Sequence, residues 1–153
     1  MSFKLMKIKS LNQSDSKEIS NIAKTLRGWF TPSGRRNIMR ACKTQKGFVA
    51  YDEKIVGFIL YRKWKSMAEI TWMGILPNYQ NKGIGTKLIK SVEDELKANA
   101  INKIKVATLS PTTKYKLYEK TRKFYRKIGF KKYRIDKKFY PDGSDRLVFL
   151  KEI

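Results

Sequence analysis

The sequence predicts a single α/β domain in which helices cover both faces of a mixed β-sheet. Short runs rich in β-branched and aromatic residues alternate with longer segments that repeat apolar residues at helical spacing. A short turn separates one pair of strand-like runs, as in a hairpin, and a helical segment separates another pair, as in a parallel crossover. The expected order is β-α-α-β-β-β-α-β-α-β-β over residues 1–153, a length that suits one core.

The N-terminal part is predicted to form one strand and two helices. Residues 3–8 form a short, mostly apolar run, as in a strand. Asp15 and Glu18 have the spacing of a capping box for the first helix. The predicted apolar face of this helix consists of Ile19, Ile22, Ala23, Leu26 and Trp29. Residues 31–34 (Thr-Pro-Ser-Gly) end it, and residues 35–43 are predicted as a second, basic helix.

The middle of the chain is predicted to form three strands, a helix and a fourth strand. Residues 47–51 and 55–65 flank a short hairpin turn, and residues 67–75 follow as the next strand. The helix after them has one apolar face, made of Ile84, Leu88, Ile89, Val92 and Leu96. Residues 103–109 form the strand after this helix, so the crossover makes residues 67–75 and 103–109 parallel.

The C-terminal part is predicted to form a helix and two strands. Pro111, Thr112 and Thr113 begin a helix over residues 114–128, and Gly129 is suited to its C-terminal end. Residues 130–135 and 147–150 are the last two strands. A strong turn signal, Tyr-Pro-Asp-Gly at residues 140–143, lies between them.

The absence of histidine narrows the possible chemistry. It excludes Ser-His-Asp and Cys-His catalysis as well as imidazole-ligated metals, so carboxylates, tyrosine, lysine or backbone amides remain. The single cysteine, Cys42, excludes an intramolecular disulfide and a multi-cysteine metal site. We expect no metal site, and we expect Cys42 to be buried on a helix face.

The chain is strongly basic, with 35 Lys and Arg against 13 Asp and Glu and a formal charge of +22. Such a field attracts anions and disfavours polycationic small molecules. Nucleic acid, acidic protein surfaces and phosphorylated cofactors are compatible partners. The alternative is that the basic composition reflects an AT-rich genome and implies no partner. No apolar run approaches the ~18 residues of a membrane span, and residues 1–9 lack signal-peptide features, so a cytoplasmic location without membrane association is expected.

Residues 75–87 (ILPNYQNKGIGTK) stand where a strand gives way to a helix. The first turn of a helix has unpaired backbone N–H groups, and glycines let an anion approach that backbone. The segment lacks the Gly-Lys-Ser/Thr ending of a P-loop and the third glycine of the dinucleotide fingerprint. It is therefore an anion-binding turn of another type or an ordinary strand-to-helix connection.

Three stretches of the sequence resemble motifs of the GNAT acetyltransferases and occur in the same order as in that family. The segment from Gln80 to Gly85 resembles the Gln/Arg-x-x-Gly-x-Gly/Ala pyrophosphate loop of that family. Residues 68–75 resemble the central strand of its histone-acetyltransferase branch, with the same spacing between glutamate and loop. Residues 121–130 resemble the family's Phe-Tyr-x-x-x-Gly-Phe at the end of the last long helix.

The resemblance implies acetyl-coenzyme A as the cofactor. It implies that the backbone of Met73 and Ile75 holds the pantetheine arm and that the Met73 amide polarises the thioester carbonyl. The cofactor-binding residues that it implies are Met73, Gly74, Ile75, Gln80, Asn81, Lys82, Gly83, Ile84, Gly85 and Thr86.

Two catalytic residues are also implied. Glu69 aligns with the glutamate that acts as the base in the histone-acetylating branch, although an ion pair with a nearby lysine is an alternative role and a water molecule is an alternative base. Tyr125 aligns with the tyrosine near the coenzyme sulfur, and a phenol with a pKa of about 10 is a proton donor at neutral pH. Its alternative role is that of a core aromatic residue.

Other positions carry weaker expectations. The family often has asparagine where this chain has Tyr118, which puts side-chain contacts to coenzyme A from that position in doubt. Lys114 and Lys116 are candidates for the coenzyme phosphates or plain surface residues. Trp64 and Trp72 are candidates for the acceptor site or for the core. Residues 31–36 occupy the place where family members shape the acceptor groove.

The expected function is N-acetyl transfer to an amine, by direct transfer in a ternary complex. A protein or peptide amine is the favoured acceptor, because Glu69 resembles the protein-acetylating branch and because the charge disfavours polycations. The alternatives are a small-molecule amine acetyltransferase and a nucleic-acid or ribosome-binding module that retains the fold. The module is suggested by the basic, aromatic-rich stretch at residues 122–138.

Overall fold

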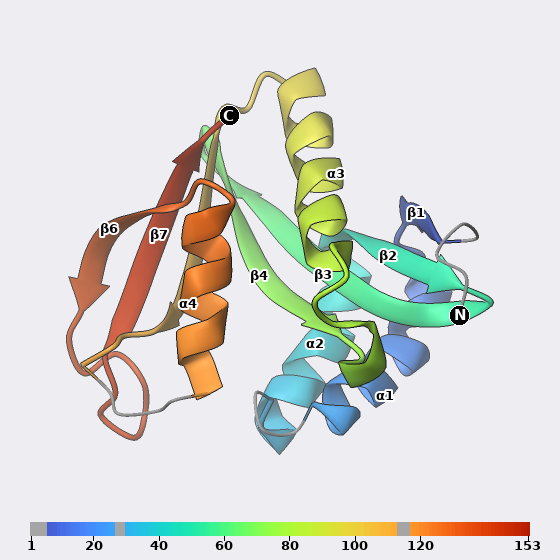
Figure 1. Ribbon diagram of the computed structural model, residues 1–153, viewed down its shortest axis with the longest axis horizontal. Coiled ribbons are helices and arrows are strands. Elements are labelled where there is room, and N and C mark those ends of the chain that lie inside the picture. Colours follow the sequence, from blue (N-terminus) through green and yellow to red (C-terminus); the bar gives the residue numbers. More distant parts are fainter. Residues whose placement is uncertain (1–5, 27–29, 113–116) are drawn as a thin grey trace.

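A seven-stranded sheet forms the centre of the computed structural model, which describes residues 6–26, 30–112 and 117–153 (Figure 1). In spatial order the strands are β1 (Lys7–Ser10), β2 (Lys46–Asp52), β3 (Lys54–Trp64), β4 (Met67–Ile75), β5 (Lys103–Leu109), β7 (Arg146–Glu152) and β6 (Lys131–Asp136). Among the described strands β4 and β5 are parallel, and the other neighbours are antiparallel. The predicted mixed sheet and its parallel pair are confirmed.

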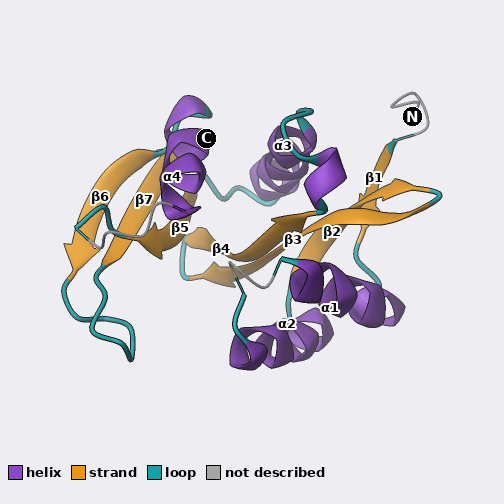
Figure 2. Cartoon of the chain, turned by 60° about the horizontal axis from the view of Figure 1, so that its bottom comes forward, coloured by secondary structure: helices purple, strands orange, loops and turns teal. Residues whose placement is uncertain are grey.

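Helices cover both faces of the sheet, as predicted (Figure 2). On one face, α3 (Ile84–Ala98) and α4 (Leu117–Lys127) close an apolar cluster that includes Leu88, Tyr125 and Phe149. On the other face, α1 (Ser16–Thr25) and α2 (Pro32–Thr44) close a second cluster on β2, β3 and β4. In the described part of the chain, no residue of β5, β6 or β7 belongs to that second cluster, so this half of the face lacks a helical cover.

The predicted capping box between Asp15 and Glu18 is wrong. A short 3₁₀ turn, η2 (Gln13–Asp15), precedes α1, and the Asn12 amide donates to Asp15 Oδ2 at 2.9 Å. The box therefore lies one turn earlier than predicted. The Glu18 carboxylate instead accepts a hydrogen bond of 3.3 Å from the Ile55 amide and so ties α1 to β3.

The second helix begins at Pro32 rather than at residue 35, because proline suits a helix start. The Thr31 hydroxyl caps it by accepting from the Gly34 amide at 3.0 Å, and Pro32 itself has no amide that would need a partner. The first helix ends at Thr25. Trp29, predicted on its apolar face, lies outside the described residues.

The remaining predicted boundaries are close to those observed. Strand β1 extends to Ser10 at the edge of the sheet, and residues 3–5 of the predicted strand lie outside the described residues. The same holds for residues 113–116 at the predicted start of the last long helix. Gly129, with φ 102°, ends α4 as predicted: the Phe130 amide donates to the Tyr125 carbonyl and the Gly129 amide to the Arg126 carbonyl.

Two irregularities in the middle of the sheet determine where the candidate functional site lies: a bulge in β4 and the divergence of β4 from β5. The β3–β4 register shifts between Leu60 and Tyr61, which makes Thr71 the extra residue of β4. Strand β4 pairs with β5 only over residues 68–70, opposite residues 104–106, although both strands continue beyond these pairs. An opening between two parallel strands therefore begins directly after the Ile70–Val106 pair.

Candidate functional site

The edge of β4 that faces this opening carries main-chain groups available to a ligand. The Leu76 amide donates to the Val56 carbonyl of β3 at 2.9 Å. Because hydrogen-bonded and non-hydrogen-bonded pairs alternate in an antiparallel ladder, the main-chain groups of Met73 and Ile75 are directed away from β3. The Ile75 carbonyl accepts from Gln80 Nε2 at 2.9 Å. The open edge suits an extended ligand that forms strand-like hydrogen bonds.

The loop after β4 has the backbone of an anion site. Asn81 has φ 62° and Gly83 has φ 82°, and Gly83 is the N-cap residue of α3. No side chain caps this helix, so the amides of its first turn face the loop, and a Cβ on Gly83 would meet nothing within 4 Å. Asn81, Lys82 and Thr86 are exposed. The turn leaves room for an anion against the positive end of a helix.

Two other glycines of the predicted site have packing reasons for lacking a side chain. A Cβ on Gly74 would lie 2.8 Å from the Phe58 ring, and one on Gly85 would lie 3.1 Å from the Phe124 ring of α4. Gly85 thus allows the start of α3 to pack closely against α4. The short connection between β4 and α3 is thereby fixed in place.

Tyr125 lies on α4 within the apolar cluster under α3 and α4, and it is 5% exposed. Its ring packs against Phe124, Phe130 and Phe149, with centroids 5.4, 5.5 and 6.0 Å away. Burial raises the pKa of its phenol, so the hydroxyl stays protonated at neutral pH. Tyr125 is therefore a core residue, and its role as proton donor stays a prediction.

Glu69 lies on the opposite face of β4. Its neighbours Ala68 and Ile70 point into the cluster under α3 and α4, so side-chain alternation directs Glu69 to the other face. Its carboxylate is ion-paired on both oxygens: Arg62 Nη2 lies 2.9 Å from Oε1 and Lys105 Nζ lies 3.1 Å from Oε2. The alternative role as a lysine partner is therefore realised, in a half-buried side chain that is 17% exposed.

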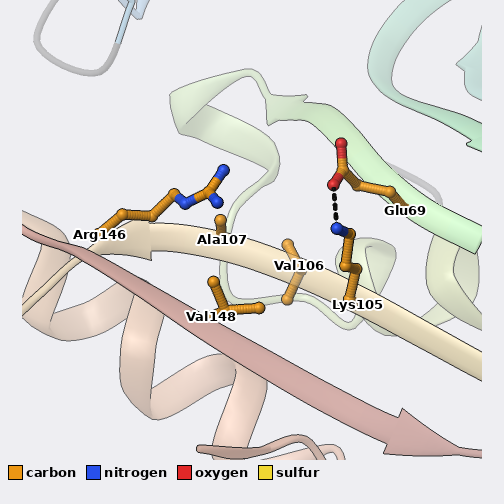
Figure 3. Close-up of a pocket in the computed structure, with 6 residues that line it drawn as sticks. All are labelled: Glu69, Lys105, Val106, Ala107, Arg146 and Val148. Carbon is orange, nitrogen blue, oxygen red and sulfur yellow. Dashed lines mark ion pairs between the residues drawn. The ribbon is translucent and has the colours of Figure 1, made fainter. Parts of the chain in front are cut away.

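A shallow hollow surrounds this carboxylate, and Figure 3 shows the residues that line it. The wall is formed by three strands and consists of Glu69, Lys105, Val106, Ala107, Arg146 and Val148. Val106 closes the last β4–β5 pair, so the hollow lies at the start of the opening between the strands. Arg146 enters from β7, which lies beside β5. The geometry combines a carboxylate, a strand opening and a glycine turn at the N-terminus of a helix.

The family follows from a comparison of sequences. The model of the acetyltransferase (GNAT) domain family matches residues 43–132, more than half of the chain. The chain belongs to the GNAT acetyltransferases. It is an acyltransferase whose acetyl donor is acetyl-coenzyme A. No curated protein matches the sequence.

Solved structures share the GNAT fold at low sequence identity. An acetyltransferase of the GNAT family from Desulfovibrio desulfuricans has a TM-score of 0.85 and 19% identity, over 96% of this chain and 98% of that chain. The ribosomal-protein-S18-alanine N-acetyltransferase from Escherichia coli has a TM-score of 0.78 and 18% identity, over 97% and 94%. The PaiA N-acetyltransferase from Thermoplasma acidophilum, in complex with coenzyme A, has a TM-score of 0.75 and 19% identity over 100% of each chain.

The residues at the opening fit the donor of a GNAT enzyme. The glycine turn offers backbone amides for a pyrophosphate, and the edge of β4 offers main-chain groups for an extended amide-containing arm. Thr108 supplies a further observation: among the described residues, its Oγ1 is the buried side-chain polar atom without a hydrogen-bond partner. Thr108 lies on β5 beyond the last β4–β5 pair, where a bound ligand would give this hydroxyl a partner.

The other predicted site residues differ in where they lie. Trp64 is exposed at the β3–β4 hairpin, away from the opening. Trp72 lies on β4 beyond the last β4–β5 pair, and its ring packs against Phe30 with centroids 6.0 Å apart, so it is placed at the opening and against the core. Cys42 is buried on α2 as expected, and burial raises the pKa of its thiol to about 11. Lys114 and Lys116 lie outside the described residues. None of the described helices is both long and apolar enough to cross a bilayer.

Sequence reasoning missed the cations of the hollow and the hydroxyl of Thr108. Arg62, Lys105 and Arg146 have no local signal that separates them from the other basic residues of the chain. A residue opposite Glu69 in the parallel pair could have been sought from the predicted register of residues 67–75 and 103–109. Arg146 could not have been found in this way, because nothing in the neighbouring sequence indicates that β7 inserts between β5 and β6.

Proposed function

We propose that this enzyme acetylates a protein or peptide amine by direct transfer in a ternary complex. The observation that carries the proposal is the position of Glu69, a half-buried carboxylate in a hollow where β4 and β5 begin to diverge. An acceptor amine can approach the hollow on the face opposite to α3 and α4. The name of the Escherichia coli neighbour assigns it an alanine of ribosomal protein S18 as acceptor, which supports a protein amine here.

The donor, when bound, supplies an activated acetyl thioester. The amide of Met73 at the open edge of β4 is the proposed donor to the carbonyl oxygen, on which negative charge develops as the amine attacks. A single backbone or side-chain donor in such a position contributes about 2.7–4 kcal/mol to catalysis. Met73, Ile75 and the loop from Gln80 to Thr86 hold the donor in this proposal.

Tyr125 and Glu69 are the proposed acid and base. A departing thiolate needs a proton, and Tyr125 carries one because burial raises the pKa of its phenol. The attacking amine must lose a proton, and Glu69, on the side from which the acceptor approaches, is the proposed group to take it. Both its oxygens accept from cations, so release of Lys105 or Arg62 would make the carboxylate a stronger proton acceptor. A water molecule held by Glu69 is the alternative base.

Direct transfer is favoured over a covalent enzyme intermediate. Cys42 is the single thiol of the chain, it is 3% exposed, and it lies in the cluster under α1 and α2 rather than at the opening. Burial raises the pKa of this thiol to about 11, so the thiolate that could attack a thioester is scarce at neutral pH.

The alternative acceptor is a small-molecule amine, and a panel of peptides and small amines separates the two. Each compound is incubated with acetyl-coenzyme A, thiol release is measured, and the product mass is checked for one added acetyl group. Transfer to peptides with little transfer to small amines is the expected outcome. The reverse order would assign the chain to small-molecule acetylation.

A further inference from the structure

The hollow around Glu69 lies on the half of the sheet that has no helical cover. The second apolar cluster ends at β4, and Figure 2 shows α1 and α2 beneath the β2–β4 half of the sheet. No described helix therefore packs on this face of β5 and β7, where Lys105 and Arg146 are partly exposed and Val148 is buried. The hollow is the part of this face at which the opening between β4 and β5 begins.

Cations outnumber carboxylates around the hollow. Lys105 and Arg146 line it, and Arg62 reaches Glu69 from β3. Glu69 is the one carboxylate among the lining residues. Side-chain exposures of 17% for Glu69, 21% for Lys105 and 20% for Arg146 mean that these charges are partly desolvated, where electrostatic interactions are stronger than at an open surface.

Arg146 is held in place from two sides. Its Nε and Nη2 atoms donate to Asp136 Oδ2 at 2.9 and 2.6 Å, and its guanidinium lies over the Phe139 ring at 3.7 Å from the centroid. Asp136 also accepts from Arg134 Nε at 3.0 Å. Asp136 therefore divides its negative charge between two arginines and does not neutralise Arg146 completely. In Figure 3 the guanidinium of Arg146 extends over Ala107 on one side of the hollow, and Lys105 and Glu69 lie on the other.

This arrangement has two consequences for an incoming amine. The surplus of positive charge disfavours the ammonium form, so it shifts the acceptor toward the neutral form that attacks a thioester. The same surplus repels an acceptor whose other groups are also cationic and attracts one that carries an anion near the amine.

We propose that the acceptor carries a carboxylate next to the reactive amine, and that Lys105 and Arg146 bind this carboxylate. The inference rests on the proposed function, because it assigns the acceptor of the same site. In this proposal Lys105 takes part both in binding the acceptor and in freeing the base. When the carboxylate of the acceptor replaces Glu69 as the partner of Lys105, one oxygen of Glu69 becomes available to the amine proton.

The exchange of one carboxylate for another conserves the ion pairs of the hollow. Lys105 Nζ keeps a carboxylate partner, Arg146 keeps Asp136, and Glu69 keeps Arg62. A neutral acceptor offers no such exchange, so Glu69 stays paired with Lys105 and serves less well as a base. Acidic acceptors are thus favoured both in binding and in turnover.

The test compares matched acceptors with and without the carboxylate. One arm uses peptides that differ only in Glu or Gln beside the reactive amine, and the other uses free amino acids and their amides. The expected result is a preference for the acidic member of at least about 10-fold in kcat/KM, the effect of one charge-assisted hydrogen bond. The larger preference is expected among the peptides. A larger preference among the free amino acids would keep the carboxylate recognition and overturn the protein or peptide acceptor.

Two variants test the assignment to residues. Lys105→Gln and Arg146→Gln each remove one positive charge and should each reduce the preference toward 1, the former without disturbing Asp136. The control Lys132→Gln removes an exposed charge on β6 away from the hollow and should keep the preference. Equal transfer to acidic and neutral acceptors, or a preference that survives Lys105→Gln, overturns the inference and leaves the proposed function standing. Absence of transfer to every acceptor overturns both.

Discussion

Glu69 and Lys105 face each other across the parallel pair of β4 and β5, with 3.1 Å between Oε2 and Nζ. The next residues along the two strands, Ile70 and Val106, form the last pair before the strands diverge. The proposed base of the enzyme is therefore engaged by a cation at the start of the opening. Opening this contact would free one oxygen of the proposed base from its cation.

The carboxylate of Glu69 is expected to matter for turnover beyond its contribution to stability through Arg62 and Lys105. Glu69→Gln should lower kcat by about 10²-fold or more, the contribution of a positioned general base. Glu93→Gln is the matched control, because Glu93 on α3 is also a shielded glutamate paired with a lysine, Lys151 of β7, away from the hollow. It should lower the free energy of unfolding and leave kcat unchanged. Equal rates for Glu69→Gln and the wild type would leave water as the base.

The hydroxyl of Tyr125 is expected to act in the chemical step. Tyr125→Phe should lower kcat by about 10²-fold or more and change the KM for acetyl-coenzyme A little, because the removed group is a proton donor. The ring contacts to Phe130 and Phe149 remain in this variant, so its thermal unfolding should match the wild type. The exposed Tyr133→Phe serves as control. An unchanged kcat in Tyr125→Phe would restrict Tyr125 to the core.

Gly83 is expected to be needed for donor binding beyond its effect on stability. Gly83→Val places a β-branched residue at φ 82° and projects a side chain into the open turn. Gly143→Val is a matched control, because Gly143 has φ 87° and likewise nothing within 4 Å of its added Cβ. Both variants should lose about 1–2 kcal/mol of stability from the left-handed backbone. Calorimetry should show a weaker affinity for coenzyme A in Gly83→Val alone.

Cys42 is expected to be dispensable for catalysis. Cys42→Ala should keep the wild-type kcat and lose a modest part of the free energy of unfolding, because it removes a buried sulfur atom from the cluster under α1 and α2. Since burial raises the pKa of the thiol to about 11, alkylation of the native enzyme at pH 7–8 should be slow. A folded variant without activity would contradict direct transfer.

The Asp136 cluster is expected to make stability depend on pH in the acid range. Hydrogen bonds from Arg146, together with Arg134, hold the pKa of this carboxyl below its usual range. A depressed folded-state pKa gives stability that is present above the unfolded-state value of about 3.9 and is lost as the pH falls through the folded-state value. Asp136→Asn should therefore lower the midpoint of denaturant unfolding at pH 7. Near pH 3 the midpoints of the variant and the wild type should lie closer together. A constant difference between the two pH values would contradict this assignment.

The sequence by itself determined the features that depend on neighbouring residues. Helical spacing placed Ile84, Leu88 and Val92 on a buried face, and Gly129 ended α4 as its position predicted. The parallel pair of strands followed from the length of the helix between them. Such features are local because each is fixed by backbone geometry over a few residues or by the reach of one connection.

The tertiary structure alone decided which distant side chains share the hollow. Strand β7 inserts between β5 and β6, and this order brings Arg146 beside Lys105 and Glu69. The bulge at Thr71 sets the β3–β4 register along which Arg62 lies opposite Glu69. Strand order and register depend on how the whole sheet buries its two apolar faces, so a basic residue near the end of the chain has no local sign that it belongs to the site.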